Sequence, residues 1–404
     1  MCGATMFKIQ TLNPIAVIGL SQFPSELYEV ASEIQQPDAI LVRSHDMHTF
    51  TLPSSVKAVG RAGAGVNNIP VAALTLQGIP VFNTPGANAN AVRELVIAGM
   101  LLASRHICQA WHYVSDLNID NDAMNKQIER DKKQFAGFEL MGKTIGVIGL
   151  GSVGVKVANA ALSLGMRVIG YDPTITVSRA WELSSEVQQA HSIDDLLMHS
   201  DFVSFHVPLT DDTKHMIDQA RIRIMKDNVV LLNFARDGLI DNVALENAIK
   251  EKKILAYVTD FPNAQLKQYP QVISLPHLGA STKEAEENCA VMIVKQIRDF
   301  FENGNIHYSV NFPSLEMAPN SNAIRLAVVN NNVPNMVAQI SSKLAAANLN
   351  IMTLLNKSKD DIAYTLIDVN NDVSESVLKE IAHISGVVQV RKLAQTHPSP
   401  KRVV

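Results

Sequence analysis

The chain has only three cysteines among its 404 residues, and they lie far apart in the sequence. A scattered, odd-numbered set of thiols argues against a disulfide framework and against a cysteine-based metal centre. The longest apolar helix candidate, residues 95–103, falls well short of the roughly 20 residues that cross a bilayer. The N-terminus also lacks the basic-then-apolar pattern of a signal peptide, so we expect a cytoplasmic protein. The cysteines, which we expect to be unreactive thiols in the core or on the surface, are Cys2, Cys108 and Cys289.

Strong charge of either sign is also missing, because the formal net charge is only −4. The chain therefore has no basic surface that would mark a nucleic-acid or anionic-membrane partner, and a small metabolite is the expected ligand. His206, His215 and His277 lack the spacing of metal ligands, so we expect no metal site. A length of 404 residues with 47% apolar content allows two or three domains with sizeable cores.

A glycine-rich turn between a strand and a helix is the strongest positive signal. The β-branched run at residues 145–148 leads into Gly149, Gly151 and Gly154, which are spaced G-x-G-x-x-G. A helix candidate of small residues follows, and a second apolar run ends at Asp172. An acid roughly 20 residues beyond such a turn is typical of a βαβ unit that binds a dinucleotide. The alternative is a tight turn in a flavodoxin-like sheet that binds no nucleotide.

Each residue of this pattern has a physical role in the expected site. Gly149 permits the tight turn, Gly151 leaves room for a pyrophosphate, and Gly154 lets the helix lie close to the strand. The free N–H groups and the dipole of the first helical turn attract the phosphate charge. Asp172 is expected to accept hydrogen bonds from the adenosine ribose and to repel a 2′-phosphate. The pattern therefore favours NAD over NADP.

The first 85 residues predict a second parallel sheet. Short apolar strands are expected at residues 15–18, 39–42, 56–59 and 80–82, with glycine- and asparagine-rich segments after their ends. Gly63 and Gly65 leave backbone N–H groups open to a carboxylate, and Arg61 can grip a carboxylate or a phosphate. Arg43, at the preceding strand end, serves the same anion or forms an ordinary surface ion pair.

Three chemically active side chains follow successive predicted strands of the dinucleotide-binding sheet: Arg236, Asp260 and His277. Because the ends of parallel strands share one edge of a sheet, these side chains are expected to converge beside the glycine turn. Imidazole titrates near neutrality, so His277 can take the proton of a hydroxyl group while hydride leaves the same carbon. Arg236 offers a cationic fork for the substrate's carboxylate and carbonyl groups. An acid beside His277 would orient its ring.

Two segments follow the first sheet. Residues 94–110 predict a buried linking helix. Residues 106–138 are polar and charged without core periodicity, so they are not expected to be buried in their own subunit. They form either a dimerisation arm or an exposed helix and loop.

Six motifs resemble those of the D-2-hydroxyacid dehydrogenases, and within that family the phosphoglycerate dehydrogenases. They are GRAGAGVNN, GIPVFNTPGANANAVRELV, GVIGLGSVG with YDP, HVPLT, NFARDGLIDNVAL and PHLGASTKEAEENCA, and they occur in this order within residues 39–292. The resemblance implies that Arg236 is the catalytic arginine and His277 the general acid/base. Family members carry a glutamate after D-V-F that pairs with the histidine. This chain has DFPNAQ instead, and Asp260 is the substitute candidate.

The resemblance also implies the remaining contacts. The expected cofactor-binding residues are Gly149, Gly151, Ser152, Val153, Gly154, Asp172, His206, Val207, Pro208, Thr213, Ala235, Arg236, Asp260, His277 and Gly279. The expected substrate-binding residues are Arg43, Arg61, Ala64, Gly65, Val66, Asn88, Arg236 and His277. Asp237 follows Arg236 where the family often has glycine, which places a negative charge beside the expected anion site.

The expected fold is α/β, with a Rossmann-type cofactor domain inserted in a flavodoxin-like substrate domain. Residues 1–100 and 281–318 are assigned to the substrate domain, and residues 101–280 to the cofactor domain. Residues 322–404 show a βαββαβ order that resembles an ACT regulatory domain. In the serine-sensing family, asparagines at the places of Asn332 and Asn350 hold the amino acid. Asn330 replaces a histidine used there, and the alternative is a dimerisation sheet that binds nothing.

The expected function is NAD-dependent oxidation of D-3-phosphoglycerate to 3-phosphohydroxypyruvate, the first step of L-serine synthesis, by a homo-oligomer (dimer or tetramer) with L-serine as effector. Two alternatives stay open. One is another D-2-hydroxyacid dehydrogenase or 2-oxoacid reductase, acting for example on glycerate or 2-hydroxyglutarate, in which Arg61 grips a carboxylate. The other is an inactive NAD-sensing corepressor-like protein, against which the retained Arg236 and His277 argue.

Overall fold

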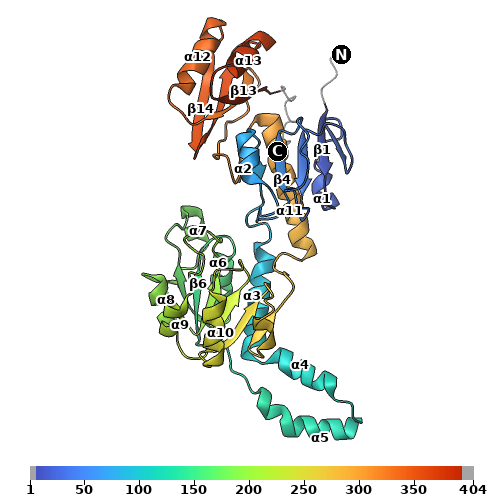
Figure 1. The fold of residues 1–404 in the computed structure, drawn as a ribbon, viewed down its shortest axis with the longest axis vertical. Coiled ribbons are helices and arrows are strands. Elements are labelled where there is room, and N and C mark those ends of the chain that lie inside the picture. The colour runs from blue at the N-terminus through green and yellow to red at the C-terminus, as the bar shows by residue number, and fades with distance from the viewer. Residues whose placement is uncertain (1–5, 394–404) are drawn as a thin grey trace, which may run out of the picture. The chain divides into compact units, whose positions relative to one another are not determined.

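A computed structural model describes residues 6–393 of the chain, so Cys2 lies outside the described residues. The chain forms two compact units, Met1–Ala87 with Glu286–Val404, and Asn88–Ala285 (Figure 1). The expected domain limits near residues 100 and 280 stay predictions. Each unit is built around a parallel sheet, and the first also carries a smaller antiparallel sheet.

The unit Asn88–Ala285 contains a seven-stranded sheet in the order β12-β11-β10-β9-β6-β7-β8. Every neighbouring pair of these strands is parallel, so all the strands end at the same edge. Strand order reverses at β6, the point where open α/β sheets bind ligands. The strands are β6 (Thr144–Ile148), β7 (Arg167–Tyr171), β8 (Gln188–Gln189), β9 (Phe202–Phe205), β10 (Val229–Asn233), β11 (Ile254–Thr259) and β12 (Val272–Ser274).

Helices cover both faces of this sheet, and β6, β9 and β10 are therefore buried along their whole length. One core combines Ile145, Val147 and Phe202 with α3 and α6, and the other combines Ile148 and Val203 with α8, α9 and α10. The Rossmann-type fold expected from the glycine turn is therefore confirmed. The helices of this unit outside the arm described below are α3 (Ala89–Ser104), α6 (Gly154–Ser163), α7 (Val177–Glu182), α8 (Ile193–His199), α9 (Gln219–Ile224), α10 (Asn242–Lys250) and the 3-10 turn η2 (Leu266–Gln268).

The single linking helix expected over residues 94–110 is wrong. Helix α3 ends at Ser104, and His106, with φ of 51°, separates it from α4 (Ile107–Asp116). The chain returns at Gly137, and the Phe138 N–H donates to the Ser104 carbonyl at 2.9 Å, so that carbonyl is no longer available to extend the helix. Gly137 is required there, because a Cβ atom would lie 2.0 Å from the Ser104 oxygen.

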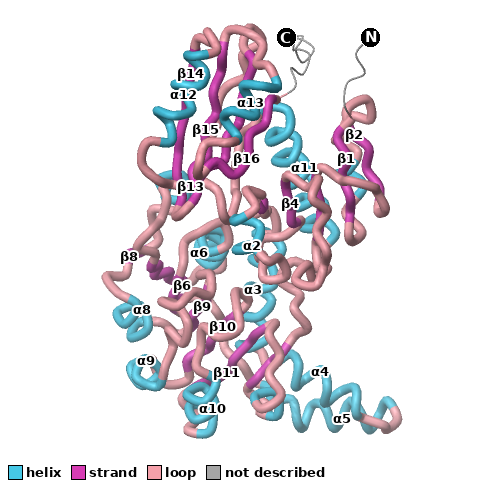
Figure 2. The backbone as a smooth tube through the Cα atoms, turned by 45° about the horizontal axis from the view of Figure 1, so that its top comes forward, coloured by secondary structure: helices cyan, strands magenta, loops and turns pink. Residues whose placement is uncertain are grey.

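Between these points the chain forms an arm of α4, α5 (Asn121–Asp131) and the 3-10 turn η1 (Lys132–Phe135). No residue of these three helices is buried, which agrees with the expectation that the segment is not part of its own unit's core. The Tyr113 hydroxyl of α4 donates to the Asp131 carboxylate of α5 at 2.8 Å, which joins the two helices. Figures 1 and 2 show the two helices running side by side away from the sheet of this unit.

The other unit begins with a five-stranded parallel sheet in the flavodoxin-like order β2-β1-β3-β4-β5, as expected. The strand expected at residues 15–18 is wrong, since these residues lead into the short helix α1 (Val17–Leu20). Gly19 of that helix packs so closely on Ala290 that a Cβ atom would lie 2.5 Å away. The elements are β1 (Phe7–Thr11), β2 (Tyr28–Ala31), β3 (Ala39–Val42), β4 (Ala58–Arg61), α2 (Val71–Leu76) and β5 (Val81–Phe82). The long helix α11 (Lys283–Asn303) packs on this sheet through Ile293, Val294 and Ile297.

The C-terminal sheet of this unit has the antiparallel order β14-β15-β13-β16 and confirms the expected βαββαβ order (Figure 2). Alternate residues of β13 face opposite sides. Leu326 and Val328 pack on α12 and α13, whereas Ala327 and Val329 join the core that contains α11. The small sheet is therefore packed on the flavodoxin-like part. Its elements are β13 (Ile324–Asn331), α12 (Met336–Ala346), β14 (Ile351–Lys359), β15 (Ile362–Val369), α13 (Glu375–Ala382) and β16 (Val387–Lys392).

Candidate active site

The glycine turn after β6 has the geometry of a phosphate-binding loop. Gly149 has φ of 89°, and Gly154 lies so close to it that a Cβ atom would be 1.9 Å from the Gly149 oxygen. A Cβ atom on Gly151 would instead meet no atom within 4 Å. Within residues 6–393, the backbone N–H groups of Gly151, Ser152 and Val153 donate to no other residue. Free amides at a helix N-terminus beside open space fit a diphosphate.

Asp172 follows β7 and is tied to this loop. Its Oδ2 accepts a hydrogen bond of 2.8 Å from the Leu150 N–H, and its Oδ1 accepts from the Thr174 N–H at 2.8 Å. The carboxylate is thereby fixed beside the glycine turn, where a dinucleotide places its adenosine ribose. The residues present therefore fit NAD.

Arg179 of α7 is a residue that sequence reasoning missed. Its Nη2 donates to Ser152 Oγ at 2.8 Å, and its Nη1 pairs with Glu182 at 2.7 Å. The guanidinium therefore lies against the phosphate-binding loop, close to where cofactor charge is expected. The lone arginine in a polar helix gave no sequence signal, because only the fold brings α7 next to the glycine turn.

The end of β9 contributes a neutral histidine. Burial lowers the pKa of His206 to about 3, although the side chain keeps some exposed area. Its Nε2 lies 2.9 Å from Ser204 Oγ, and its backbone oxygen lies against Gly149. His206 thus lines the glycine turn and remains uncharged at neutral pH.

The HVPLTDDT segment after β9 is closed by one side chain. Thr213 Oγ1 donates to the Pro208 carbonyl at 2.6 Å and accepts from the Thr210 N–H at 2.8 Å. Val207 also packs against Gly149. Of the three residues expected to bind the cofactor here, Thr213 holds the loop together, Pro208 is exposed and Val207 supports the glycine turn.

The turn that carries Arg236 is held by Asn233 at the end of β10. Asn233 Nδ2 donates to the Arg236 carbonyl at 3.0 Å, and its Oδ1 accepts from the Ala235 N–H at 3.2 Å. The Tyr257 hydroxyl lies 3.4 Å from the same Nδ2. Arg236 itself is exposed, and so is Asp237. The sequence signal that could have identified Asn233 is an asparagine at the last position of an otherwise apolar strand.

Asp260, after β11, is a buried carboxylate with one oxygen unpaired. Only 1% of the residue is exposed. Oδ2 accepts from the Gly279 N–H at 2.8 Å, whereas Oδ1 has no hydrogen-bond partner within the described chain. Burial raises the pKa of Asp260, and the Gly279 amide and the charges of His277 and Arg236 act in the opposite direction.

His277 follows β12 in a left-handed conformation with φ of 45°. Its N–H donates to the Asp260 carbonyl at 2.9 Å, so the backbone of the two residues is joined. Its exposed ring lies edge-on to Phe261, with the ring centroids 5.1 Å apart. The described chain records no hydrogen bond from this ring to the Asp260 carboxylate. Arg236, Asp260 and His277 nonetheless each follow a strand of the same parallel sheet, so all three lie at one edge of it.

In the other unit, the loop after β4 turns its carbonyl groups inward. The Gly63, Ala64 and Gly65 oxygens accept from the Thr84 N–H, from Asn83 Nδ2 at 2.6 Å and from Arg61 Nη1. The N–H groups of Ala64, Gly65 and Val66 donate to no other residue between positions 6 and 393. Three free amides in succession are suited to a carboxylate.

Both expected arginines of this unit already have protein partners. Arg61 Nε donates to the Arg43 carbonyl at 3.1 Å, and its Nη1 contacts the Gly65 oxygen, so it braces its own loop. Arg43 forms an ion pair of 2.6 Å with Glu286. The expected substrate residue Asn88 lies at the first position of the unit Asn88–Ala285, where it precedes α3.

The asparagines expected to bind an effector lie at opposite ends of the C-terminal sheet. Asn332 donates to the Asp360 carbonyl at 3.0 Å at the β14–β15 turn, whereas the Asn350 N–H donates to Asn370 at 3.0 Å beyond the far end of β15. Asn330 is buried, and its Oδ1 lacks a partner among the described residues. Asn332 and Asn350 of one chain therefore cannot hold one small ligand together.

The described residues also bear on three other kinds of feature: metal sites, membrane-spanning helices and reactive cysteines. Residues 6–393 do not bring three or more histidine, cysteine or acidic side chains together as metal ligands. No helix in that range has the length and apolar character of a membrane crossing. Burial raises the pKa of the Cys108 and Cys289 thiols, which disfavours the reactive thiolate.

Comparisons with known proteins agree with this geometry. Residues 97–279 match the family model described as D-isomer specific 2-hydroxyacid dehydrogenase, NAD binding domain. The D-3-phosphoglycerate dehydrogenase of Haemophilus influenzae is 31% identical over 350 residues, which are 83% of this chain and 81% of that protein. The hydroxypyruvate reductase of Thermotoga maritima is 36% identical over 281 residues, 67% of this chain and 86% of that protein.

Among solved structures, the NAD+-bound 3-phosphoglycerate dehydrogenase of Entamoeba histolytica matches with a TM-score of 0.60 and 28% identity. The match covers 77% of this chain and all of that one. The chain spans about half the length, 54%, of other D-3-phosphoglycerate dehydrogenases that it matches at 35 to 39% identity. The family model, the two relatives matched over most of their length and the shared fold all agree. The chain therefore belongs to the D-isomer-specific 2-hydroxyacid dehydrogenase family.

Proposed function

We propose that this chain is an NAD-dependent dehydrogenase that oxidises D-3-phosphoglycerate to 3-phosphohydroxypyruvate, the first step towards L-serine. One observation carries the proposal: the glycine loop, Asp172, Arg236, Asp260 and His277 share one edge of a parallel sheet. The activities named for the relatives support the substrate class. We place the reaction in the cytoplasm, where NAD and phosphorylated metabolites are held.

The proposed mechanism divides the chemistry among three side chains. Bound NAD supplies the acceptor for the hydride that leaves the substrate's C2. His277 takes the proton of the C2 hydroxyl as general base, and in the reverse direction it donates that proton to the carbonyl oxygen. Arg236 binds the carboxylate and stabilises the developing carbonyl dipole. Asp260, whose backbone carbonyl accepts the His277 N–H at 2.9 Å, holds the segment that carries His277 in place.

A carboxylate-binding role is also proposed for the loop after β4. The free amides of Ala64, Gly65 and Val66 receive the carboxylate, and Arg61 fixes the loop that carries them. Because Arg61 and Arg43 already bind a carbonyl and a carboxylate, recognition of the phosphate by either requires them to exchange partners. That observation favours a second candidate, a reductase for a 2-oxoacid without phosphate.

A substrate comparison distinguishes the two candidates. We expect kcat/KM with NAD to be highest for D-3-phosphoglycerate and at least tenfold lower for D-glycerate, D-lactate and D-2-hydroxyglutarate. A factor of ten corresponds to about 1.4 kcal/mol of transition-state binding, which one charged contact supplies. Equal values for phosphoglycerate and glycerate would contradict the phosphate assignment and support the second candidate.

Matched variants test the catalytic roles. His277→Asn and Arg236→Met are expected to lower kcat by about 10² to 10⁴. His191→Asn and Arg223→Met change exposed residues of the same unit and should leave kcat unchanged. Full turnover in the two site variants would remove Arg236 and His277 from the mechanism, whereas a parent chain that binds NAD without turnover would support the inactive NAD-sensing protein.

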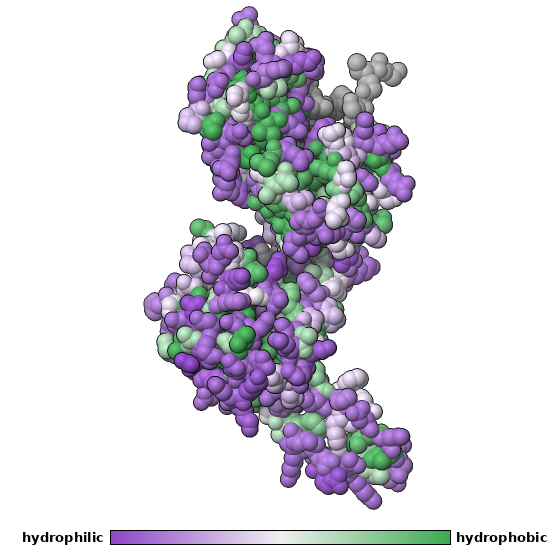
Figure 3. Space-filling model, in the orientation of Figure 1, coloured by the Kyte–Doolittle hydropathy of each residue, from purple (hydrophilic) through white to green (hydrophobic). Residues whose placement is uncertain are grey.

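We further propose that the arm of α4 and α5 packs against a second copy of the chain. The arm exposes Ile107, Val114 and Ile119, and Trp111 is 70% exposed. Figure 3 shows hydrophobic surface on this arm. An apolar patch with such a large aromatic residue is typical of an interface. Trp111→Asp is expected to lower the mass of the oligomer in light scattering, while Trp181→Asp, at a still more exposed tryptophan outside the arm, leaves the oligomer intact.

We also propose that the C-terminal sheet is a regulatory domain for L-serine. Because Asn332 and Asn350 lie at opposite ends of the sheet, the effector requires one residue from each of two chains. Asn350→Ala should abolish inhibition by serine without changing activity in its absence. Undiminished inhibition of Asn350→Ala by serine would contradict this assignment.

A further inference from the structure

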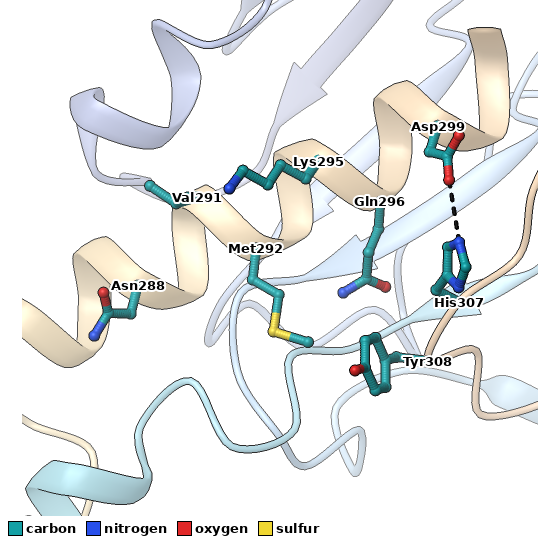
Figure 4. A pocket seen from close by; sticks show the side chains of 8 residues that line it. All are labelled: Asn288, Val291, Met292, Lys295, Gln296, Asp299, His307 and Tyr308. Atoms are coloured by element: carbon teal, nitrogen blue, oxygen red, sulfur yellow. Dashed lines mark ion pairs between the residues drawn. The ribbon is translucent and has the colours of Figure 1, made fainter. Parts of the chain in front are cut away.

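A pocket of about 310 Å³ lies along one face of α11 in the unit Met1–Ala87 with Glu286–Val404 (Figure 4). Its volume is at the small end of the range for ligand sites. Val291, Met292, Lys295 and Gln296 project from the helix, and His307 and Tyr308 close the pocket from the following segment. Figure 4 shows Gln296 and Met292 on the side of the helix that faces Tyr308.

The floor of the pocket contains a buried acceptor without a partner. Gln296 is only 6% exposed, and its Nε2 donates to the Asn83 carbonyl at 2.9 Å, which fixes the amide orientation. Its Oε1 is buried and accepts no hydrogen bond within the described chain. Because buried polar atoms are normally satisfied, an Oε1 atom in a pocket wall calls for a donor from a ligand or a water molecule.

An acidic and a basic side chain, Asp299 and Lys295, lie at different places around the pocket. Asp299 pairs with His307 at 3.2 Å at one end of the pocket. Lys295, one turn earlier on the helix, is exposed and forms no ion pair with another residue in the range 6–393. The walls between them are the apolar side chains of Val291 and Met292 and the ring of Tyr308. A fitting ligand therefore has a donor or cation, an anion and an apolar body.

The pocket is connected to the substrate loop by two hydrogen bonds. Gln296 binds the Asn83 carbonyl, and Asn83 Nδ2 in turn donates to the Ala64 carbonyl at 2.6 Å. Ala64 belongs to the stretch whose outward amides are assigned to the substrate carboxylate. A ligand that fixes the Gln296 amide therefore also restrains this loop.

We propose that this pocket binds an apolar α-amino acid. Its ammonium group donates to Gln296 Oε1 near Asp299, its carboxylate pairs with Lys295, and its side chain packs on Met292 and Tyr308. The site is separate from the asparagines of the C-terminal sheet. Its occupancy stiffens the loop of residues 61–69 through Asn83.

Calorimetry on the full chain, without NAD or hydroxy acid, tests the proposal independently of any dehydrogenase activity. L-Leucine, L-methionine and L-phenylalanine are titrated, with isocaproate and isopentylamine as ligands that lack the amine or the carboxylate. We expect one saturable site per chain for at least one amino acid, and at least tenfold weaker binding of both truncated ligands. Absence of saturable binding by all three amino acids overturns the proposal, and a water molecule then satisfies Gln296 Oε1.

Three variants locate the site. Met292→Trp fills the pocket and should abolish binding, whereas Lys295→Met and Gln296→Met should each weaken it at least tenfold. Lys267→Met and Asn350→Ala are controls that should bind normally. If Gln296→Met fails to fold, the other two pocket variants decide. Unchanged affinity in Met292→Trp overturns the assignment, as does unchanged hydrogen exchange of residues 61–69 at saturating amino acid.

Discussion

Asp260 Oδ2 accepts a hydrogen bond of 2.8 Å from the Gly279 N–H, while Asp260 Oδ1 is buried without a partner in the described chain. The bond joins the segment after β11 to the segment after β12. His277 belongs to the second segment, two residues before Gly279. Burial raises the pKa of this carboxyl group. A buried, ionised carboxylate with only one of its two oxygens hydrogen-bonded costs free energy in the folded state. Ionisable groups of this kind are concentrated at functional sites.

Asp260→Asn is therefore expected to lower activity and raise stability at neutral pH. An acid whose pKa is raised on folding contributes stability at low pH, and this contribution is lost as the pH rises through the folded pKa. The variant should accordingly gain free energy of unfolding relative to the parent as the pH rises from about 4 to 7. Denaturant unfolding across that range measures the difference. A constant difference at every pH would show that Asp260 does not titrate as described.

Two glycines of the same loop should respond oppositely to alanine. Gly151→Ala places a Cβ atom in open space, so the unfolding midpoint should not change, but NAD affinity should fall roughly tenfold as the methyl group blocks the diphosphate. Gly154→Ala brings a Cβ atom within 1.9 Å of the Gly149 oxygen and should cost about 1–3 kcal/mol of stability. Fluorescence titration with NADH and thermal unfolding measure the two effects. Unaltered NADH binding by Gly151→Ala would remove this loop from cofactor binding.

His206 should make stability depend on pH in the acid range. Burial lowers its pKa from 6.5 to about 3, so the unfolded chain binds a proton that the folded chain does not. Stability is then fully present above pH 6.5 and decreases by about 1.4 kcal/mol per pH unit as the pH falls towards 3. His206→Gln should lack this part of the slope. Identical slopes for parent and variant, measured by urea unfolding, would contradict a buried neutral imidazole.

The sequence predicted those features of the fold and site that follow from the order of residue types within a short segment. The glycine spacing, the buried β-branched strands and the strand ends at Arg236, Asp260 and His277 follow from periodicity and from the shared edge of a parallel sheet. The first strand was assigned to residues 15–18 because they are more apolar than FKIQT of β1, but they lead into the helix α1.

Long-range contacts could not be predicted in the same way. The break after α3 depends on Phe138, which lies more than thirty positions along the chain from Ser104. The support of Arg236 by Asn233 and Tyr257, and the engagement of Arg61 with its own loop, depend on backbone paths that sequence alone does not define. Gln296 appears in the sequence as one more polar residue on an amphipathic helix.

The last prediction concerns the attachment of the C-terminal sheet. Arg325 is 8% exposed and pairs with Asp368 through two hydrogen bonds of 2.7 and 2.9 Å. The same guanidinium donates to the carbonyls of Met317 and Ala318, so it joins β13 and β15 to the segment that precedes them. Arg325 therefore has a structural role: it connects the C-terminal sheet to the segment at Met317 and Ala318 within one unit.

Arg325→Met should cost about 3–5 kcal/mol, because it leaves the Asp368 carboxylate buried without a cation. The double variant Arg325→Met with Asp368→Leu removes the stranded charge and should recover a large part of that loss. Denaturant unfolding of the parent, both single variants and the double variant gives the coupling energy. Lys343→Met, which breaks an exposed pair with Glu380, is the control and should change stability by less than about 1 kcal/mol. Additive losses in the double variant would show that the Arg325–Asp368 pair contributes no coupling, and the attachment would then depend on apolar packing of β13 and β15 against α11.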